Sequence, residues 1–197
     1  VCSMRFMEAE GRAKAAENLR RNGFDGLIVM GGNGSLTGAH LLATEQKVRV
    51  IGVPGSIDND IGCTSLALGV DTALNTIVEA CDHISDTARA HRRAFVVEVM
   101  GRDCGYLAMA SAVAVGADGV LIREQGKSEG QLVEALAGVI RHGVARGKRR
   151  ILIIKAEGVQ TPCTRLVRVT QESLASELPG LEIRATVLGH VVRGGPP

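Results

Sequence analysis

Six apolar runs of strand length recur along the chain, and a longer segment separates each from the next. The runs are nearly continuous and rich in Val and Ile, as strands covered on both faces are. Strands that alternate with helices predict a parallel sheet with helices on both sides, so the fold class expected is α/β, a three-layer αβα arrangement. The six runs span 25–32, 48–55, 94–101, 118–124, 150–157 and 183–189.

The segments between the runs carry helix signals. Ser128 and Gln131 fit a capping box at the start of one helix, and Pro179 is expected to end another. The longest helical segment is a candidate bridge between two lobes. Helices are expected at 8–22, 70–89, 104–115, 129–145 and 170–178.

Composition excludes several classes of protein. The formal charge of +2 and the aromatic content of 2% argue against a nucleic-acid partner. No apolar run reaches the length of a membrane span, and the start of the chain has no signal-peptide pattern. The five cysteines are odd in number and lack metal-ligand spacing, which favours a reducing compartment. We therefore expect a cytoplasmic protein with no membrane partner.

Two loops follow neighbouring strand candidates at the edge where parallel sheets bind ligands. The first, "GGNGS" (31–35), offers backbone amides and a following helix to a phosphate group, although it also fits an ordinary strand-to-helix turn. The second, "PGSIDNDIG" (54–62), contains Asp58 and Asp60. Carboxylates there can accept a proton or hold a metal, although solvated aspartates in an Asx-turn have the same pattern.

Three further strands end in charged residues. Arg102 in "VMGRDCGYLA" can hold a phosphate through two hydrogen bonds, or it is an ordinary surface arginine. Glu157 ends the strand before "GV" and can accept sugar hydroxyls. In "IRATVLGHVVRGG", Arg184, His190 and Arg193 surround one strand and suggest a phosphate-sized site.

Four long motifs in this order resemble the ATP-type 6-phosphofructokinase family. "GGNGSLTGA" looks like its nucleotide loop and "PGSIDND" like its catalytic loop. "FVVEVMGRDCGYLA" and "RATVLGHVVRGG" look like its sugar-phosphate segments. The similarity covers almost the whole chain, and it implies two Rossmann-like lobes. It also implies phosphoryl transfer from ATP to the 1-hydroxyl of fructose 6-phosphate, with Mg²⁺ as cofactor.

The resemblance implies a role for each matching residue. Asp58 would accept the proton of the 1-hydroxyl, Ser56 would touch the transferring phosphoryl group, and Asp60 would lie near the metal. Arg102 and Mg²⁺ would neutralise the moving charge. The sugar-phosphate pocket would comprise Met100, Gly101, Arg102, Glu157, His190 and Arg193.

The resemblance also implies a homo-oligomer, a tetramer in the family. Arg93 and Arg184 match arginines that reach into the pocket of a neighbouring subunit. The glycines at positions 34 and 55 indicate that ATP is the phosphoryl donor, because pyrophosphate-using relatives tend to carry Asp and Lys at these positions. The residues expected near ATP are Arg5, Phe6, Gly32, Asn33, Gly34 and Ser35.

The chain departs from the family at several positions. Asn33 replaces an aspartate directed toward Mg²⁺, and a neutral amide is a weaker ligand for that ion. Thr64 stands near the place of an acidic residue, and Ser85 replaces an effector-binding arginine. Other effector-site positions keep charged residues, namely Asp118, Arg146 and Lys148.

We expect residues 1–69 to be part of a nucleotide-binding lobe and 70–197 most of a sugar-phosphate lobe. The family's opening glycine-rich loop and its final stretch are not recognised here, so we expect a fragment that is inactive alone. Three rivals remain: a regulatory sugar-phosphate-binding relative, a pyrophosphate-dependent enzyme and a dinucleotide-binding oxidoreductase. The last fits poorly, since "GGNGSLTG" lacks the expected glycine spacing.

Overall fold

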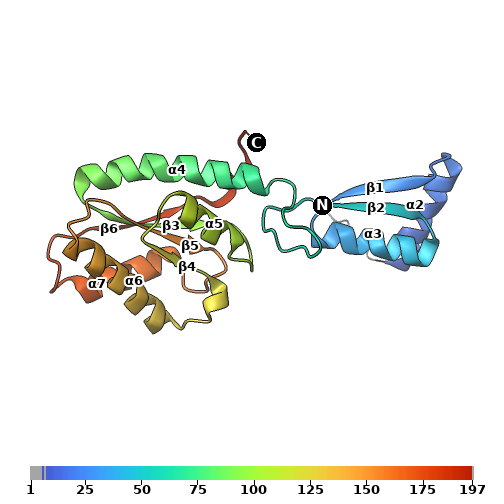
Figure 1. Ribbon diagram of the computed structural model, residues 1–197. Coiled ribbons are helices and arrows are strands. Elements are labelled where there is room, and N and C mark those ends of the chain that lie inside the picture. Colours follow the sequence, from blue (N-terminus) through green and yellow to red (C-terminus); the bar gives the residue numbers. More distant parts are fainter. Residues whose placement is uncertain (1–5, 7, 197) are drawn as a thin grey trace. The chain divides into compact units, whose positions relative to one another are not determined.

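The computed structural model describes residue 6 and residues 8–196 (Figure 1). These residues form two compact units. Unit 1 comprises the described residues up to Ser56 together with Asp60–Leu68. Unit 2 comprises Ile57–Asn59 and the described residues from Gly69 onward.

Unit 1 is a two-stranded parallel sheet with helices on one face. Strands β1 (Gly26–Gly31) and β2 (Arg49–Pro54) pair along their whole length. Helix α3 (Asn33–Gln46) connects them and packs on both, and helix α2 (Ala9–Arg21) packs on α3. The β1–α3–β2 unit therefore has the parallel crossover that the sequence pattern predicts.

The second face of this sheet differs from the expectation that the strands are covered on both sides. Alternate side chains of β1 and β2 are open to solvent: Ile28 is 64%, Met30 68% and Ile51 65% exposed. Among the described residues of unit 1, no helix covers this apolar face.

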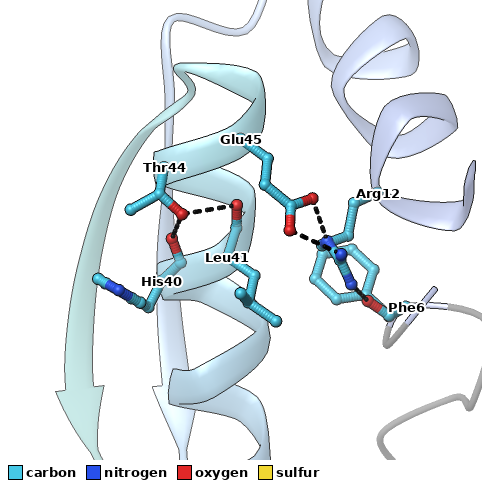
Figure 2. Close-up of polar contacts among 6 residues, drawn as sticks. All are labelled: Phe6, Arg12, His40, Leu41, Thr44 and Glu45. Carbon is cyan, nitrogen blue, oxygen red and sulfur yellow. Dashed lines mark hydrogen bonds and ion pairs between the residues drawn. The ribbon is translucent and has the colours of Figure 1, made fainter. Parts of the chain in front are cut away.

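A buried arginine joins α2 to α3. Arg12 is 5% exposed, and its Nε and Nη2 donate to the two carboxylate oxygens of Glu45 at 2.7 and 2.8 Å (Figure 2). Its Nη1 donates to the Phe6 carbonyl at 3.1 Å. Figure 2 also shows the Thr44 hydroxyl donating to carbonyls of the preceding turn. The fork of the guanidinium thus fixes Phe6 beside these two helices.

Unit 2 is built on a four-stranded parallel sheet in the order β4-β5-β3-β6. Helices α4 and α5 pack together on one face, and α6 and α7 pack together on the other (Figure 1). Central strand β5 is buried along its whole length because helices cover both of its faces. The strands are β3 (Ala94–Val99), β4 (Gly119–Leu121), β5 (Ile151–Ala156) and β6 (Ile183–Val187). The helices are α4 (Val70–His91), α5 (Tyr106–Ala114), α6 (Glu129–Ala145) and α7 (Cys163–Leu174), with short 3-10 turns η1 (Arg123–Gln125) and η2 (Gly189–Arg193).

The α/β fold class is confirmed, but one predicted helix is wrong. The segment 170–178 contains only the end of α7, which begins at Cys163 directly after Pro162 and ends at Leu174. Its buried face repeats every three or four residues, which fits a helix from Cys163. Pro179 misled the prediction, because the helix stops five residues before it and not at it.

Candidate functional site

The carboxyl ends of β1 and β2 bring the first two sequence motifs together. The strands are parallel neighbours, and the Gly55 amide donates to the Gly31 carbonyl at 2.9 Å just past their ends. The prediction that both loops end neighbouring strands of one sheet is therefore confirmed.

The glycine-rich motif is shorter as a loop than expected, because helix α3 already begins at Asn33. Gly32 is the N-cap, and no side chain caps this end. A side chain at Gly31 would have its Cβ 2.8 Å from Ser35, which is why the turn into the helix needs glycine there. The positive end of α3 is thus available at the carboxyl edge of the sheet, where a phosphate group would be attracted.

Asn33 and Asp60 form a direct hydrogen bond across the two loops. The Asn33 side-chain amide, Nδ2, donates to the Asp60 carboxylate, Oδ2, at 2.8 Å. Because the contact lies at the exposed surface, Asp60 is accessible to a cation through its remaining lone pairs.

The donor set here fits a lightly held magnesium ion. Among the residues that the structure describes, no group of three or more His, Cys, Asp or Glu side chains gathers as a metal site. Mg²⁺ is usually held by one or two carboxylates together with substrate phosphates and water, so the single carboxylate of Asp60 is compatible with that mode.

The second loop contains the boundary between the two compact units. Ser56 and Asp60 group with unit 1, whereas Asp58 and Asn59 group with unit 2. Asp58 is half-buried, and Asn59 has a φ of 52°, a left-handed conformation that Asn tolerates better than most residues.

In unit 2, predicted sugar-phosphate residues lie where the connections that follow two adjacent strands lead to opposite faces of the sheet. After β3 the chain turns to α5 on one face, and after the adjacent β5 it turns toward α7 on the other. Glu157 lies between these two strand ends, and its Oε1 accepts from the amides of Gly101 at 3.1 Å and Arg102 at 2.5 Å. Such a switch point is where open parallel sheets bind ligands.

The same turn is conformationally unusual. Gly101 has a φ of +146°, and a Cβ there would lie 2.6 Å from the Cys104 carbonyl oxygen. The next residue, Arg102, has a φ of +51°, which is uncommon for a residue with a side chain. The carboxylate of Glu157 holds both amides, so it fixes the direction in which the exposed Arg102 leaves the turn.

His190 and Arg193 lie on turn η2, directly after β6, which pairs with β3. The Leu188 amide donates to the Glu98 carbonyl at 3.0 Å and continues the pairing to the strand ends. Thr76 of α4 donates to the Gly194 carbonyl at 2.7 Å and anchors the end of the turn. His190 and Arg193 therefore come to the same edge of the sheet as Arg102 and Glu157.

Arg93 and Arg184 are not brought to this edge. Arg93 precedes β3, and Arg184 pairs with Phe95 near the amino ends of the strands. Both guanidinium groups form ion pairs with one carboxylate, that of Glu182. The pocket residues and these two arginines thus lie at opposite ends of the sheet.

Comparison with known proteins agrees with this geometry. The family model described as phosphofructokinase matches residues 2–197. The chain belongs to the phosphofructokinase family. It is 48% identical over 195 residues to an ATP-dependent 6-phosphofructokinase of Natranaerobius thermophilus, covering 99% of this chain and 58% of that protein. It is 44% identical over 192 residues to the same-named protein of Thermoanaerobacter sp. (strain X514), covering 98% and 57%. The chain thus spans less than two thirds of these relatives.

Solved phosphofructokinase structures share the fold. The phosphofructokinase of Saccharomyces cerevisiae superposes with a TM-score of 0.85 at 36% identity, covering 97% of this chain and 28% of that one. The Pichia pastoris enzyme in the T-state gives 0.87 at 38% identity, covering 98% and 22%.

Sequence reasoning missed a buried charge in β5, close to the point where the connections after β3 and β5 diverge. Lys155 is 1% exposed in β5, and its ammonium group donates to Glu98 at 2.7 Å and to the carbonyls of Ala156 and Val159. Burial raises the pKa of the nearby Cys163 thiol to about 11, and the carboxylate of Glu98 adds to the shift. The lysine inside the apolar run "ILIIKAE" was the sequence signal that could have revealed this buried charge.

Two of the three charged residues expected at effector positions pair with each other. Lys148 pairs with Asp118, whose second oxygen accepts from the Leu152 amide at 2.9 Å. Ser85 accepts from Arg150 at 3.0 Å. Arg146 is the exposed C-cap of α6.

Two predicted nucleotide contacts precede α2. Arg5 lies outside the described residues. Phe6 is described, and its ring contacts the helix surface at Gly38, where an added Cβ would lie 3.0 Å from it.

No helix in the part of the chain described is long and apolar enough to cross a membrane.

Proposed function

We propose that the complete protein is a 6-phosphofructokinase, which transfers the terminal phosphoryl group of ATP to the 1-hydroxyl of fructose 6-phosphate. The observation that carries the proposal is the switch point of unit 2, where Glu157 holds the amides of Gly101 and Arg102. The names of relatives 44–48% identical to the chain support the same reaction.

In this proposal the chain positions the reactants and balances charge, since phosphoryl transfer needs little covalent help. Asp58 accepts the proton of the attacking hydroxyl, and Ser56 contacts the transferring group. Mg²⁺, when bound, neutralises charge on the phosphate oxygens, and Asp60 with Asn33 would hold it. Arg102 stabilises the charge that develops during transfer.

The sugar phosphate is proposed to bind at the carboxyl edge of the unit 2 sheet. Glu157 accepts sugar hydroxyls, and His190 and Arg193 hold the phosphate, while Met100 and Gly101 form the wall. Arg93 and Arg184, at the other end of the sheet, are proposed to serve a neighbouring subunit in a homo-oligomer. A tetramer and a cytoplasmic location are part of the same proposal.

ATP is the proposed phosphoryl donor. The amide end of α3, with Gly32, Gly34 and Ser35, would face its phosphates. No atom lies within 4 Å of a Cβ built at Gly34, so this position leaves room that a larger side chain would fill. Arg5 and Phe6 are proposed to complete the nucleotide contacts.

The hydrogen bond between Asn33 and Asp60 favours one alternative. Because the Asn33 amide occupies an oxygen of Asp60, the protein could be a weakened, regulatory relative that binds the sugar phosphate without rapid turnover. Allosteric control through Asp118 and Lys148 belongs to either version of the proposal.

A coupled assay of ADP release by the complete gene product tests these alternatives. Fructose 6-phosphate and Mg²⁺ are varied, and pyrophosphate replaces ATP in a parallel series. Activity that Asp58→Asn reduces at least about 100-fold supports the kinase, since a missing general base costs roughly that much. Activity only in Asn33→Asp supports the regulatory version. Turnover with pyrophosphate but not with ATP contradicts the proposal. So does a result in which neither the natural protein nor Asn33→Asp turns over or binds fructose 6-phosphate.

A further inference from the structure

A cavity of about 740 Å³ lies in unit 2 between the amino ends of α6 and α7. The loops that follow β4 and β5 form its walls, so it opens at the carboxyl ends of these strands. None of the residues predicted for catalysis, sugar-phosphate binding, nucleotide binding or metal binding lines it. The cavity is large enough for a metabolite.

A buried threonine lines this cavity. Thr161 is 7% exposed, lines the cavity, and makes no side-chain hydrogen bond to the described residues. Every fully enclosed side-chain nitrogen or oxygen in the described part of the chain has a partner. The Thr161 hydroxyl is therefore not fully enclosed, and a largely buried hydroxyl of this kind gains from a ligand in the cavity that completes its hydrogen bonding.

The amino end of α7 provides further donors beside Thr161. Its N-cap is Pro162, which has no side chain able to cap, and the first helical bond runs from the Leu166 amide to the Pro162 carbonyl. Within the described chain, the amides of Cys163, Thr164 and Arg165 have no backbone or side-chain acceptor. The amino end of α6 differs, because the Ser128 side chain caps it.

The charge in the lining is positive. Glu129 is the one carboxylate among the lining residues, and Arg165 holds both of its oxygens at 2.9 Å. This pairing lowers the Glu129 pKa, chiefly through the hydrogen bond from Arg165, so the carboxylate stays ionised and neutralised. Arg123 pairs with Asp103 outside the cavity. Lys127 has no ion-pair partner in the described chain and supplies the remaining charge.

We propose that this cavity binds the phosphate group of a small metabolite. The hydroxyl of Thr161, the amide of Arg165 and the ammonium group of Lys127 would donate to its oxygens. A tetrahedral anion with several acceptor oxygens matches this set of donors, because helix amino ends and lysine both favour phosphate. The proposal is independent of the catalytic function proposed above, since the two sites share no residue.

Solution NMR of the ¹⁵N-labelled 197-residue chain tests the proposal. Inorganic phosphate, fructose 6-phosphate and ADP are titrated separately, so the strongest of them identifies the source as free phosphate, a sugar phosphate or a nucleotide. We expect saturable shifts of the amide signals of Thr164 and Arg165. Lys127→Ala and Thr161→Val should each weaken binding about tenfold, the effect of losing one hydrogen bond to a charged group.

Matched variants separate this site from others. Lys14→Ala removes an exposed lysine of unit 1, and Thr87→Val changes an exposed threonine of α4, away from the cavity. Both should leave the affinity unchanged. Arg102→Ala should abolish binding at the proposed catalytic pocket while these shifts persist. Lys127 is exposed, so its variant remains informative even if Thr161→Val does not fold.

Two outcomes would overturn the proposal. One is the absence of saturable shifts at Thr164 and Arg165 with all three probes up to roughly 10 mM, a concentration at which the free energy of binding is below about 3 kcal/mol. The other is an affinity that Lys127→Ala leaves unchanged, because the bound phosphate would then lie elsewhere.

Discussion

The turn at Gly101 and Arg102 concentrates conformational strain at one point of the candidate site. Two successive residues have φ values of +146° and +51°. A non-glycine residue in the left-handed region costs about 1 kcal/mol, so the conformation persists only when neighbouring groups hold it. Glu157 supplies that restraint by accepting from both amides. The orientation of Arg102 therefore depends on a carboxylate 55 residues further along the chain.

Replacing the glycine should show how tightly this turn is constrained. Gly101→Ala adds a Cβ that would lie 2.6 Å from the Cys104 carbonyl oxygen at a φ that alanine avoids. We expect the free energy of unfolding to fall by about 2 to 4 kcal/mol, measured by urea denaturation. Gly130→Ala is the control, because it lies in α6 with no atom within 4 Å, and should gain about 0.5 kcal/mol. Equal stabilities would show that the turn is not strained.

The buried thiol of Cys163 makes stability depend on alkaline pH. Burial raises its pKa from 9.0 to about 11. Between these values the unfolded chain loses the thiol proton and the folded chain keeps it, so stability is full below pH 9 and falls as pH rises toward 11. We expect Cys163→Ala to remove about 1 to 2 kcal/mol of that fall in urea titrations at pH 8 and pH 10. The exposed Cys63→Ala is the control. An unchanged pH dependence in Cys163→Ala would contradict the assignment.

Residue patterns predicted some contacts and missed others for a clear reason. The loops with Asn33 and Asp60 were expected to meet because parallel strand ends share an edge, and the two side chains do so at 2.8 Å. Lys155 and Thr161 were missed because their importance comes from burial, which depends on helices distant in sequence. Residue type alone cannot distinguish a buried lysine in a strand from a surface one.

At the scale of elements, local signals located most boundaries correctly. The capping box at Ser128 and Gln131 was predicted and is present, with both reciprocal hydrogen bonds formed. Helix α7 was misplaced because its start has no capping side chain, only Pro162. The apolar repeat from Cys163 to Leu174 was the better guide, since packing on β3 and β6 decides where this helix lies.

The cap of α6 gives an element-scale prediction. Ser128→Ala removes the acceptor of the Gln131 amide and leaves one helix donor without a partner. The free energy of unfolding should fall by about 1 kcal/mol in thermal or urea denaturation. Ser176→Ala, at an exposed position just after α7, should change stability by less than about 0.5 kcal/mol. A loss at Ser128 no larger than that at Ser176 would mean that solvent satisfies this helix end equally well.

At the scale of the whole molecule, the two units have unequal means of stabilisation. Unit 2 buries a four-stranded sheet between two helical layers. The buried apolar residues among the described part of unit 1 are few and mostly small: Ala16, Ala39, Leu42 and Ala67. Its sheet has two strands, and Ile28, Met30 and Ile51 remain 64–68% exposed on one face. Two-stranded sheets with so little burial are marginally stable by themselves.

We therefore expect the two units of this chain to open with different free energies. Native-state hydrogen exchange should give the β1 amides of Leu27 and Val29, which face β2, protection at least about tenfold lower than the amides of Val96 and Ile153 in unit 2, because local opening follows local burial. Low denaturant should leave exchange in β1 unchanged, since a small local opening exposes little surface, while exchange in β5 should accelerate with global unfolding. Equal protection in both sheets, with the same denaturant dependence, would mean that unit 1 is stabilised as strongly as unit 2 and unfolds with it as one cooperative structure.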